Sequence, residues 1–268
     1  MENMEIKEQV LNTHLAAVEK LWQENQDNGF VRKLRESNLE EAIKALPGFK
    51  EAFKNFLDTV DCSDGRVLLG DKFGIAGSGI LLSGEDRRKY IEYIRGLAKV
   101  LTSHDDCGAA KALFAEMAAT GQPMPDGVTT ADELGKYIIA QIAKEVEAKH
   151  IHLSRKEMAE ESHDEFGIVV DGTVRFSSTR LNGFPPHFVC SGAGIGLSDG
   201  YIQKEIAMLS GIAFGGHGFG DRLTPESPFH IVIVAKDEAQ KEHLSALASD
   251  VLKDYGSRVK VDAMTVEL

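Results

Sequence analysis

The sequence predicts an α/β fold with a central, mostly parallel sheet flanked by helices, a helical arm before it and an extension after it. From residue 59 onwards, short apolar segments alternate with longer amphipathic ones. The short segments are bounded by turn residues and are apolar throughout, which is typical of parallel strands that are buried on both faces. Residues 1–57 instead carry apolar residues at helical spacing.

Residues 1–57 are predicted to form the helical arm. Ser37 and Glu40 fit a capping box that opens its second helix, and Pro47-Gly48 should end that helix before a third one over Phe49–Leu57. The first helix has one apolar stripe, made of Val10, Leu11, His14, Leu15, Val18, Leu21 and Trp22. Because these positions recur three and four residues apart, that face of the helix is expected to be buried.

The next part of the chain is predicted to contain parallel strands and their connecting helices. The expected strands run from Thr59 into Cys62, over Lys72–Ile75 and over Lys99–Thr102. A helix over Arg87–Leu97 separates the last two, and another covers residues 109–119. Thr130 and Glu133 form a capping box that opens a further helix. Its inner face is expected to carry Leu134, Ile138, Ile142 and Val146.

The remainder of the chain is richer in glycine. Asp171-Gly172 marks either a hairpin or a turn between strands. A buried strand over Phe229–Val234, a helix over Lys236–Asp254 and a strand over Arg258–Val266 should follow. No convincing internal repeat is evident. The expected division is a helical arm over residues 1–57, a core over residues 58–180 and a C-terminal α/β extension over residues 181–268.

Composition excludes several classes of partner. The 268 residues include 30 Lys and Arg against 42 Asp and Glu, which gives a formal net charge of −12. An acidic surface does not favour binding to nucleic acid or to an anionic membrane. No apolar run approaches the length of a membrane span, and the first residues lack a signal-peptide pattern, so we expect a cytoplasmic protein. With three cysteines in a reducing compartment, disulfides are not expected.

Two short motifs carry the chemistry. The first is Asp61-Cys62-Ser63-Asp64-Gly65-Arg66, and the second is Ser103-His104-Asp105-Asp106-Cys107-Gly108. Cys62, His104 and Cys107 offer two thiolates and one imidazole, the ligand types that suit Zn²⁺. Cys62 and His104 each follow a predicted strand and should therefore meet at the carboxyl edge of one sheet. Three protein ligands leave one position open, which is typical of catalytic rather than structural zinc.

This pair of motifs, Cys-x-Asp-x-Arg and His-x-x-Cys-Gly, resembles those of the β-class carbonic anhydrases. The resemblance implies that Cys62, His104 and Cys107 bind Zn²⁺ and that Asp64 and Arg66 form a salt-bridged catalytic dyad beside the metal. It also implies reversible hydration of CO₂ to bicarbonate by a zinc-bound hydroxide. A homodimer or a dimer of dimers is the expected assembly.

Other interpretations of the same motifs stay open. The zinc site can instead serve the hydrolysis of carbon disulfide or carbonyl sulfide, or the chain can be a non-catalytic protein stabilised by zinc. Asp64, rather than water, can occupy the fourth metal position at rest. Asp64 and Arg66 can also form an ordinary surface ion pair.

The remaining motifs favour structural roles. Cys190 is interpreted as core packing. The glycines around Gly194 and Gly215 do not complete a dinucleotide-binding fingerprint and are expected to be turns or close-packed loops. Gly196-Leu-Ser198-Asp-Gly200 matches the nucleophile elbow of serine hydrolases, but no strand precedes the serine, so this interpretation is disfavoured.

Overall fold

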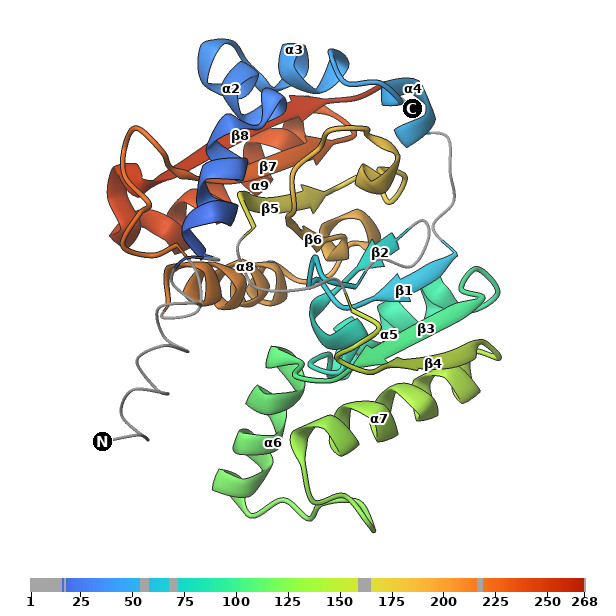
Figure 1. The fold of residues 1–268 in the computed structure, drawn as a ribbon. Coiled ribbons are helices and arrows are strands. Elements are labelled where there is room, and N and C mark those ends of the chain that lie inside the picture. The colour runs from blue at the N-terminus through green and yellow to red at the C-terminus, as the bar shows by residue number, and fades with distance from the viewer. Residues whose placement is uncertain are drawn as a thin grey trace, which may run out of the picture.

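The computed structural model describes residues 16, 18–53, 58–67, 72–158, 165–215 and 219–267. Within these residues the chain forms two four-stranded parallel sheets with helices around them (Figure 1). The predicted α/β class is therefore confirmed, with the parallel strands divided between two sheets. No helix among the described residues is long and apolar enough to cross a bilayer.

The first sheet has the strand order β2-β1-β3-β4. Its strands are β1 (Thr59–Asp61), β2 (Lys72–Gly74), β3 (Val100–His104) and β4 (Lys149–Leu153). Its helices are α5 (Gly84–Ile94), α6 (Gly108–Thr120) and α7 (Ala131–Glu145), with the short 3-10 turn η1 (Ala76–Gly79) after β2. Figure 1 shows α6 and α7 at the end of the molecule that is farthest from the second sheet. The three strands expected from the sequence are present, whereas β4 was not anticipated.

The second sheet has the order β6-β5-β7-β8. Its strands are β5 (Gly167–Asp171), β6 (Phe188–Cys190), β7 (Phe229–Ala235) and β8 (Val259–Thr265). The connecting helices are α8 (Asp199–Phe214) and α9 (Glu238–Leu252), and the short 3-10 turns are η2 (Ser178–Arg180), η3 (Gly192–Ile195) and η4 (Lys253–Arg258). Because β5 pairs in parallel with both β6 and β7, Asp171-Gly172 is a turn between strands and the hairpin alternative is wrong.

Both sheets repeat one order of strands, second-first-third-fourth along the chain. A matching turn follows the second strand of each: Ala76-Gly77-Ser78-Gly79 after β2 and Ala193-Gly194-Ile195-Gly196 shortly after β6. The expectation that the chain lacks an internal repeat is thus wrong at the level of topology. We call residues 58–158, which contain β1–β4, the first half, and residues 165–267, which contain β5–β8, the second half. The two halves share only short segments of similar sequence, so the repeat is visible in strand order rather than in sequence.

The two sheets meet at their β2 and β6 edges. The backbone N–H of Ser191 donates to the carbonyl of Gly74 at 2.8 Å, and that of Val189 donates to the carbonyl of Ser63 at 3.0 Å. A Cβ atom added at Gly74 would lie 2.6 Å from the Cβ of Val189. The absence of a side chain at Gly74 therefore allows this close approach of the two edges.

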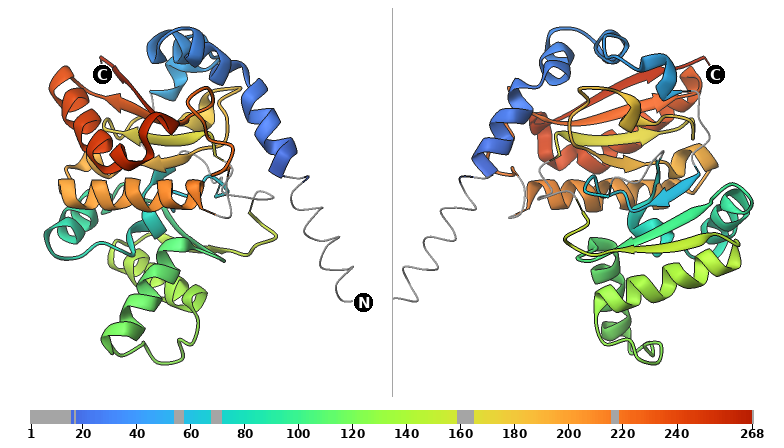
Figure 2. Two further views of the ribbon diagram at one scale, coloured as in Figure 1. Left: turned by 90° about the vertical axis from the view of Figure 1, so that its left-hand side faces the viewer. Right: turned by 45° about the vertical axis from the view of Figure 1, so that its right-hand side comes forward.

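The described part of the N-terminal arm packs on the chain's own second sheet. It contains a helix over residues 18–27, followed by α2 (Gly29–Glu36), α3 (Leu39–Lys44) and α4 (Phe49–Ala52). Alternate residues of the sheet, such as Val169 and Val232, face α2 and α3, whereas Ile168 and Ile231 face α8 and α9. The second sheet is thus covered on both faces (Figure 2).

The predicted start of α3 and both predicted ends of α5 differ from the structure, whereas the predicted start of α7 agrees with it. The cap of α3 is Asn38, whose side chain accepts from the backbone N–H of Glu41, and not Ser37. Helix α5 begins at Gly84 and ends at Ile94, because Arg95 leaves the helical conformation and Gly96 has a φ of 78°. The predicted capping box of α7 is confirmed, since Thr130 and Glu133 cap each other's backbone. Residues 1–15 and 54–57, which carry part of the predicted apolar stripe and of the third helix, lie outside the described residues.

Candidate metal centre

Three elements of the first half bring Cys62, His104 and Cys107 together. Cys62 directly follows β1, His104 is the last residue of β3, and Cys107 is the N-cap residue of α6. Since β1 and β3 are parallel neighbours, their carboxyl ends reach the same edge of the sheet. This is the edge at which open α/β sheets place their sites. The sequence prediction that these ligand types converge is confirmed as a matter of geometry.

The three side chains have a geometry that fits a metal ion. Their ligand atoms all lie within 4.8 Å of one another, and all three residues are buried. The sulfur atoms of Cys62 and Cys107 are 4.0 Å apart. Tetrahedral zinc with Zn–S bonds of about 2.3 Å separates two sulfurs by roughly 3.8 Å. The group can therefore hold a metal ion with little movement of either thiolate.

The imidazole of His104 is oriented for ligation through Nε2. Its Nδ1 lies 2.8 Å from the backbone carbonyl of Asp105, which can only accept a hydrogen bond, so Nδ1 carries the proton. In the neutral imidazole, Nε2 is then the lone-pair nitrogen, and it is buried without a hydrogen-bond partner among the described residues. A buried acceptor without a partner is costly unless it binds something. This arrangement is the one by which backbone carbonyls commonly orient histidine ligands.

The two thiols differ in acidity when no metal is bound. Hydrogen bonding with Cys107 lowers the pKa of Cys62 well below its ordinary value, with a further contribution from His104. Hydrogen bonding with Cys62, together with burial, raises the pKa of Cys107. The backbone N–H of Gly77 also donates to the sulfur of Cys62 at 3.2 Å. Cys62 is thus prepared as a thiolate, whereas Cys107 must release its proton when a metal binds.

Asp64 and Arg66 form a buried, bidentate ion pair beside the three ligands. Nη2 of Arg66 lies 2.6 Å from Oδ2 of Asp64, and Nε lies 3.0 Å from Oδ1. Burial alone would raise the pKa of Asp64, but the hydrogen bonds and charge of Arg66 outweigh it and hold that pKa well below its usual range. The surface-ion-pair alternative is wrong, because the two side chains are only 7% and 10% exposed.

A small cavity adjoins two of the ligands. Its volume of about 10 Å³ is enough for one water molecule. Its walls include His104 and Cys107, the turn η1 and the inner faces of α6 and α7; the lining residues are Gly77, Ser78, Ile80, Ser103, His104, Cys107, Ala110, Gly135 and Ile139. The space suits only a very small molecule unless the walls move.

The described residues of the second half do not repeat the metal-binding group. Gly172 follows β5 where Cys62 follows β1, and Asp237 caps α9 where Cys107 caps α6. When the β5–β7 pair is aligned with the β1–β3 pair by their registers, Lys236 stands at the position that corresponds to His104. A Cβ atom at Gly172 would lie 2.5 Å from Oε1 of Gln240, so that side chain fills the space. Among the described residues, the first half alone carries the thiolate–imidazole set.

A hydrogen-bonded network beside His104 was not anticipated. The hydroxyl of Ser103 lies 2.8 Å from Nε2 of His150 and 2.9 Å from Nδ1 of His152. Nε2 of His152 in turn lies 3.0 Å from a carboxylate oxygen of Asp105. The two histidines stand two residues apart on β4, a spacing that places both on one face of a strand. Because no strand is predicted over these residues, the shared face of the two histidines was not expected.

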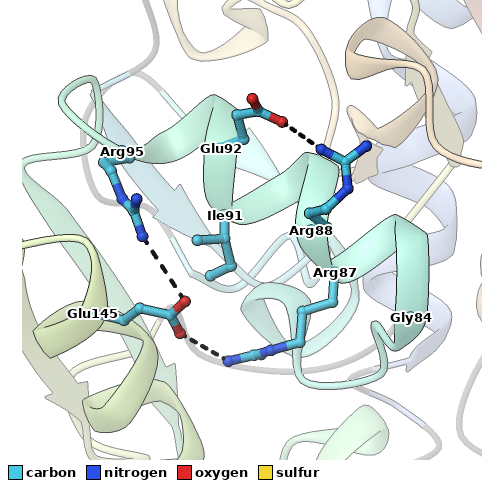
Figure 3. A pocket seen from close by; sticks show the side chains of 7 residues that line it. All are labelled: Gly84, Arg87, Arg88, Ile91, Glu92, Arg95 and Glu145. Atoms are coloured by element: carbon cyan, nitrogen blue, oxygen red, sulfur yellow. Dashed lines mark hydrogen bonds and ion pairs between the residues drawn. The ribbon is translucent and has the colours of Figure 1, made fainter.

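A larger hollow lies elsewhere, over α5, and has a volume of about 450 Å³. Three arginines line it, but each is paired with a carboxylate: Arg87 and Arg95 with Glu145, and Arg88 with Glu92 (Figure 3). Their positive charges are therefore already neutralised in part, and the hollow offers no concentrated charge for an anion.

The disfavoured motifs take structural roles. Ser198 is the N-cap residue of α8, and its hydroxyl is hydrogen-bonded to Asp86. The turn η3, and not a strand, precedes it, so the nucleophile-elbow hypothesis is wrong. Gly194 lies in a close-packed turn, since an added Cβ would meet Val174 at 2.4 Å. Cys190 is buried at the end of β6, as expected for a core residue.

The chain shows no significant match to a protein-family model, to a curated protein or to a solved structure.

Proposed function

We propose that the chain is a zinc-dependent carbonic anhydrase that hydrates CO₂ reversibly to bicarbonate. The observation that carries the proposal is the buried Cys62, His104 and Cys107 group with a bidentate Asp64–Arg66 pair beside it. Neither motif alone points to this chemistry. Their combination at one sheet edge supports a catalytic metal rather than a structural one, because three protein ligands leave a position open.

Cys62, His104 and Cys107 would hold the zinc ion. When bound, zinc supplies Lewis acidity, which two thiolates and one neutral imidazole reduce relative to a site of three histidines. The reaction also needs a group that orients the reacting water. The carboxylate of Asp64, beside the ligands, can do this.

Asp64 is assigned the role of accepting a hydrogen bond from the reacting water. It remains ionised because Arg66 occupies its oxygens from one side and lowers its pKa. Arg66 also fixes the carboxylate in one orientation through two side-chain nitrogens and its own backbone N–H. Burial of the pair limits competing water and keeps this geometry rigid.

Stopped-flow measurement of CO₂ hydration by the zinc-loaded chain tests the proposal. The expected result is turnover well above the uncatalysed rate. Zinc binding without CO₂ hydration would contradict the proposal, and hydrolysis of carbon disulfide by the same sample would then assign the site to the alternative substrate. The molar mass in solution tests the homodimer or dimer of dimers that the resemblance implies.

A further inference from the structure

Glu205 is a buried carboxylic acid that reaches from the second half of the chain into the first. It lies on the inner face of α8, where its neighbours Tyr201, Ile202, Ile206 and Leu209 are also buried. Glu205 is only 3% exposed. Its oxygen Oε1 accepts hydrogen bonds from the hydroxyl of Ser63, at 2.8 Å, and from the backbone N–H of Ala76. A buried carboxyl group is tolerated because such partners replace water.

The two partners of Glu205 belong to the two segments that hold the sulfur of Cys62. Ser63 is the next residue after Cys62. Ala76 precedes Gly77, whose backbone N–H donates to the Cys62 sulfur at 3.2 Å. One oxygen of Glu205 therefore ties together the loop that carries the thiolate and the turn that donates a hydrogen bond to it.

The Gly77 turn has little freedom to adopt another arrangement. Gly77 has a φ of 56°, and a Cβ atom at that position would lie 2.4 Å from a methyl group of Ile80. Only glycine fits this left-handed, close-packed position. The direction of its N–H thus depends on how Ala76, the preceding residue, is held.

Glu205 is anchored on its own side as well. Cys190, at the end of β6, lies close enough to the Glu205 side chain for each group to shift the pKa of the other. Burial raises the pKa of Cys190 well above its ordinary value, so its thiol keeps the proton. The carboxyl group thus links β6 of the second half to the two metal-site segments of the first.

We propose that Glu205 is a positioning residue for the metal centre, through which the second half of the chain fixes the Cys62 sulfur for metal binding. This inference rests on the metal site of the proposed function but not on its substrate. Glu205 acts through Ser63 and Ala76, not by touching the metal. Without it, the thiolate and the Gly77 N–H lose their common support.

The test compares Glu205→Met, which removes the acceptor, with Glu205→Gln, which retains a carbonyl oxygen at the same distance along the side chain. Zinc affinity is measured by competition with a chromophoric chelator, and the Co²⁺-substituted chain is examined by absorption spectroscopy. Loss of an outer-shell partner commonly weakens metal binding about 10–100-fold. We expect a loss in that range and a changed Co²⁺–thiolate spectrum for Glu205→Met, with substantial recovery in Glu205→Gln.

Leu209→Ala is the matched control, because Leu209 is buried on the same helix but belongs to the core of the second half. It should lower the stability of the chain and leave zinc affinity unchanged. Ser63→Ala removes one of the two hydrogen bonds and keeps the inference testable if Glu205→Met fails to fold; it should weaken zinc binding by about threefold to tenfold.

Wild-type zinc affinity and an unchanged Co²⁺ spectrum in Glu205→Met, or in Ser63→Ala if the former does not fold, would overturn the inference and leave Glu205 a structural link. A wild-type chain that binds zinc but does not hydrate CO₂ would contradict the proposed function alone. A wild-type chain that binds no zinc would contradict both.

Discussion

Arg66 holds Asp64 through both its guanidinium group and its backbone N–H, at distances of 2.6 to 3.2 Å. Asp64 and Arg66 stand two and four residues after Cys62 in the sequence, and both side chains are almost completely buried. The negative charge of Asp64 acts to raise the pKa values of Cys62, His104 and Cys107. The dyad and the ligand group are thus one electrostatic unit.

Replacement of Asp64 by Asn should remove the anionic acceptor while leaving the side chain's size unchanged. Loss of a group that handles a proton in the reaction typically costs 10²–10⁴-fold. We therefore expect CO₂ hydration to fall by about 10²-fold with zinc still bound, as measured by stopped flow and metal analysis. The control is Arg88→Ala, which removes an exposed ion pair and should leave turnover unchanged. Full activity in Asp64→Asn would show that the dyad is structural.

Even a methyl group at position 74 should lower the stability of the chain. In Gly74→Ala, the added methyl group would meet Val189 at the junction of the two sheets. Overpacking of this kind costs about 1–3 kcal/mol of unfolding free energy, measurable by urea denaturation. Gly211→Ala, in the middle of α8 with open space around it, should instead stabilise the chain by about 1 kcal/mol. Equal stability of the two variants would contradict the described junction.

Asp171 should make stability depend on pH. Burial raises its pKa from 3.8 to about 6, partly offset by hydrogen bonds from Thr173. Since the folded state favours the protonated form, this residue destabilises the fold as pH rises from about 4 through 6. At about 1.4 kcal/mol per pKa unit, the change approaches 3 kcal/mol.

Asp171→Asn retains an acceptor for Thr173 and removes the charge. Relative to wild type, its unfolding free energy should therefore rise by about 2–3 kcal/mol between pH 4 and pH 7.5, as determined by denaturation at each pH. Asp126→Asn, at an exposed position, should follow the wild type. If the difference between Asp171→Asn and wild type is the same at both pH values, Asp171 is not the source.

Ser198→Ala distinguishes a helix cap from a nucleophile. The hydroxyl caps α8 and is hydrogen-bonded to Asp86. Loss of an N-cap costs about 0.5–2 kcal/mol of stability. We expect a reduced melting temperature with zinc content and CO₂ hydration retained. Abolished turnover in a folded, zinc-loaded variant would instead support a catalytic role for Ser198.

Much of the first half could be predicted because its signals are local. The Thr130–Glu133 capping box and the placement of Cys62 and His104 after short apolar strands depend on neighbouring residues alone. The assigned roles of Asp64 and Arg66, and the division of the chain into domains, remain predictions.

Long-range features could not be derived in the same way. Helix α8 was not predicted, although Tyr201, Ile202, Ile206 and Leu209 follow helical spacing, because attention to the glycine-rich segment before it led only to an expectation of turns or close-packed loops. A glutamate at position 205, within this apolar stripe, indicates a buried polar contact. Its partners could not be found from the sequence, because Ser63 and Ala76 lie 142 and 129 residues away. The repeated strand order likewise appears only when the strands are paired.

The metal content of the freshly reduced chain tests the central claim most directly. We expect one zinc ion per chain in the wild type and in Cys190→Ser, and loss of zinc in Cys62→Ser, His104→Ala and Cys107→Ser. Because the described residues of the second half contain no such ligand set, two ions per chain are not expected. A wild-type chain without bound zinc, or retention of zinc in all three ligand variants, would contradict the account.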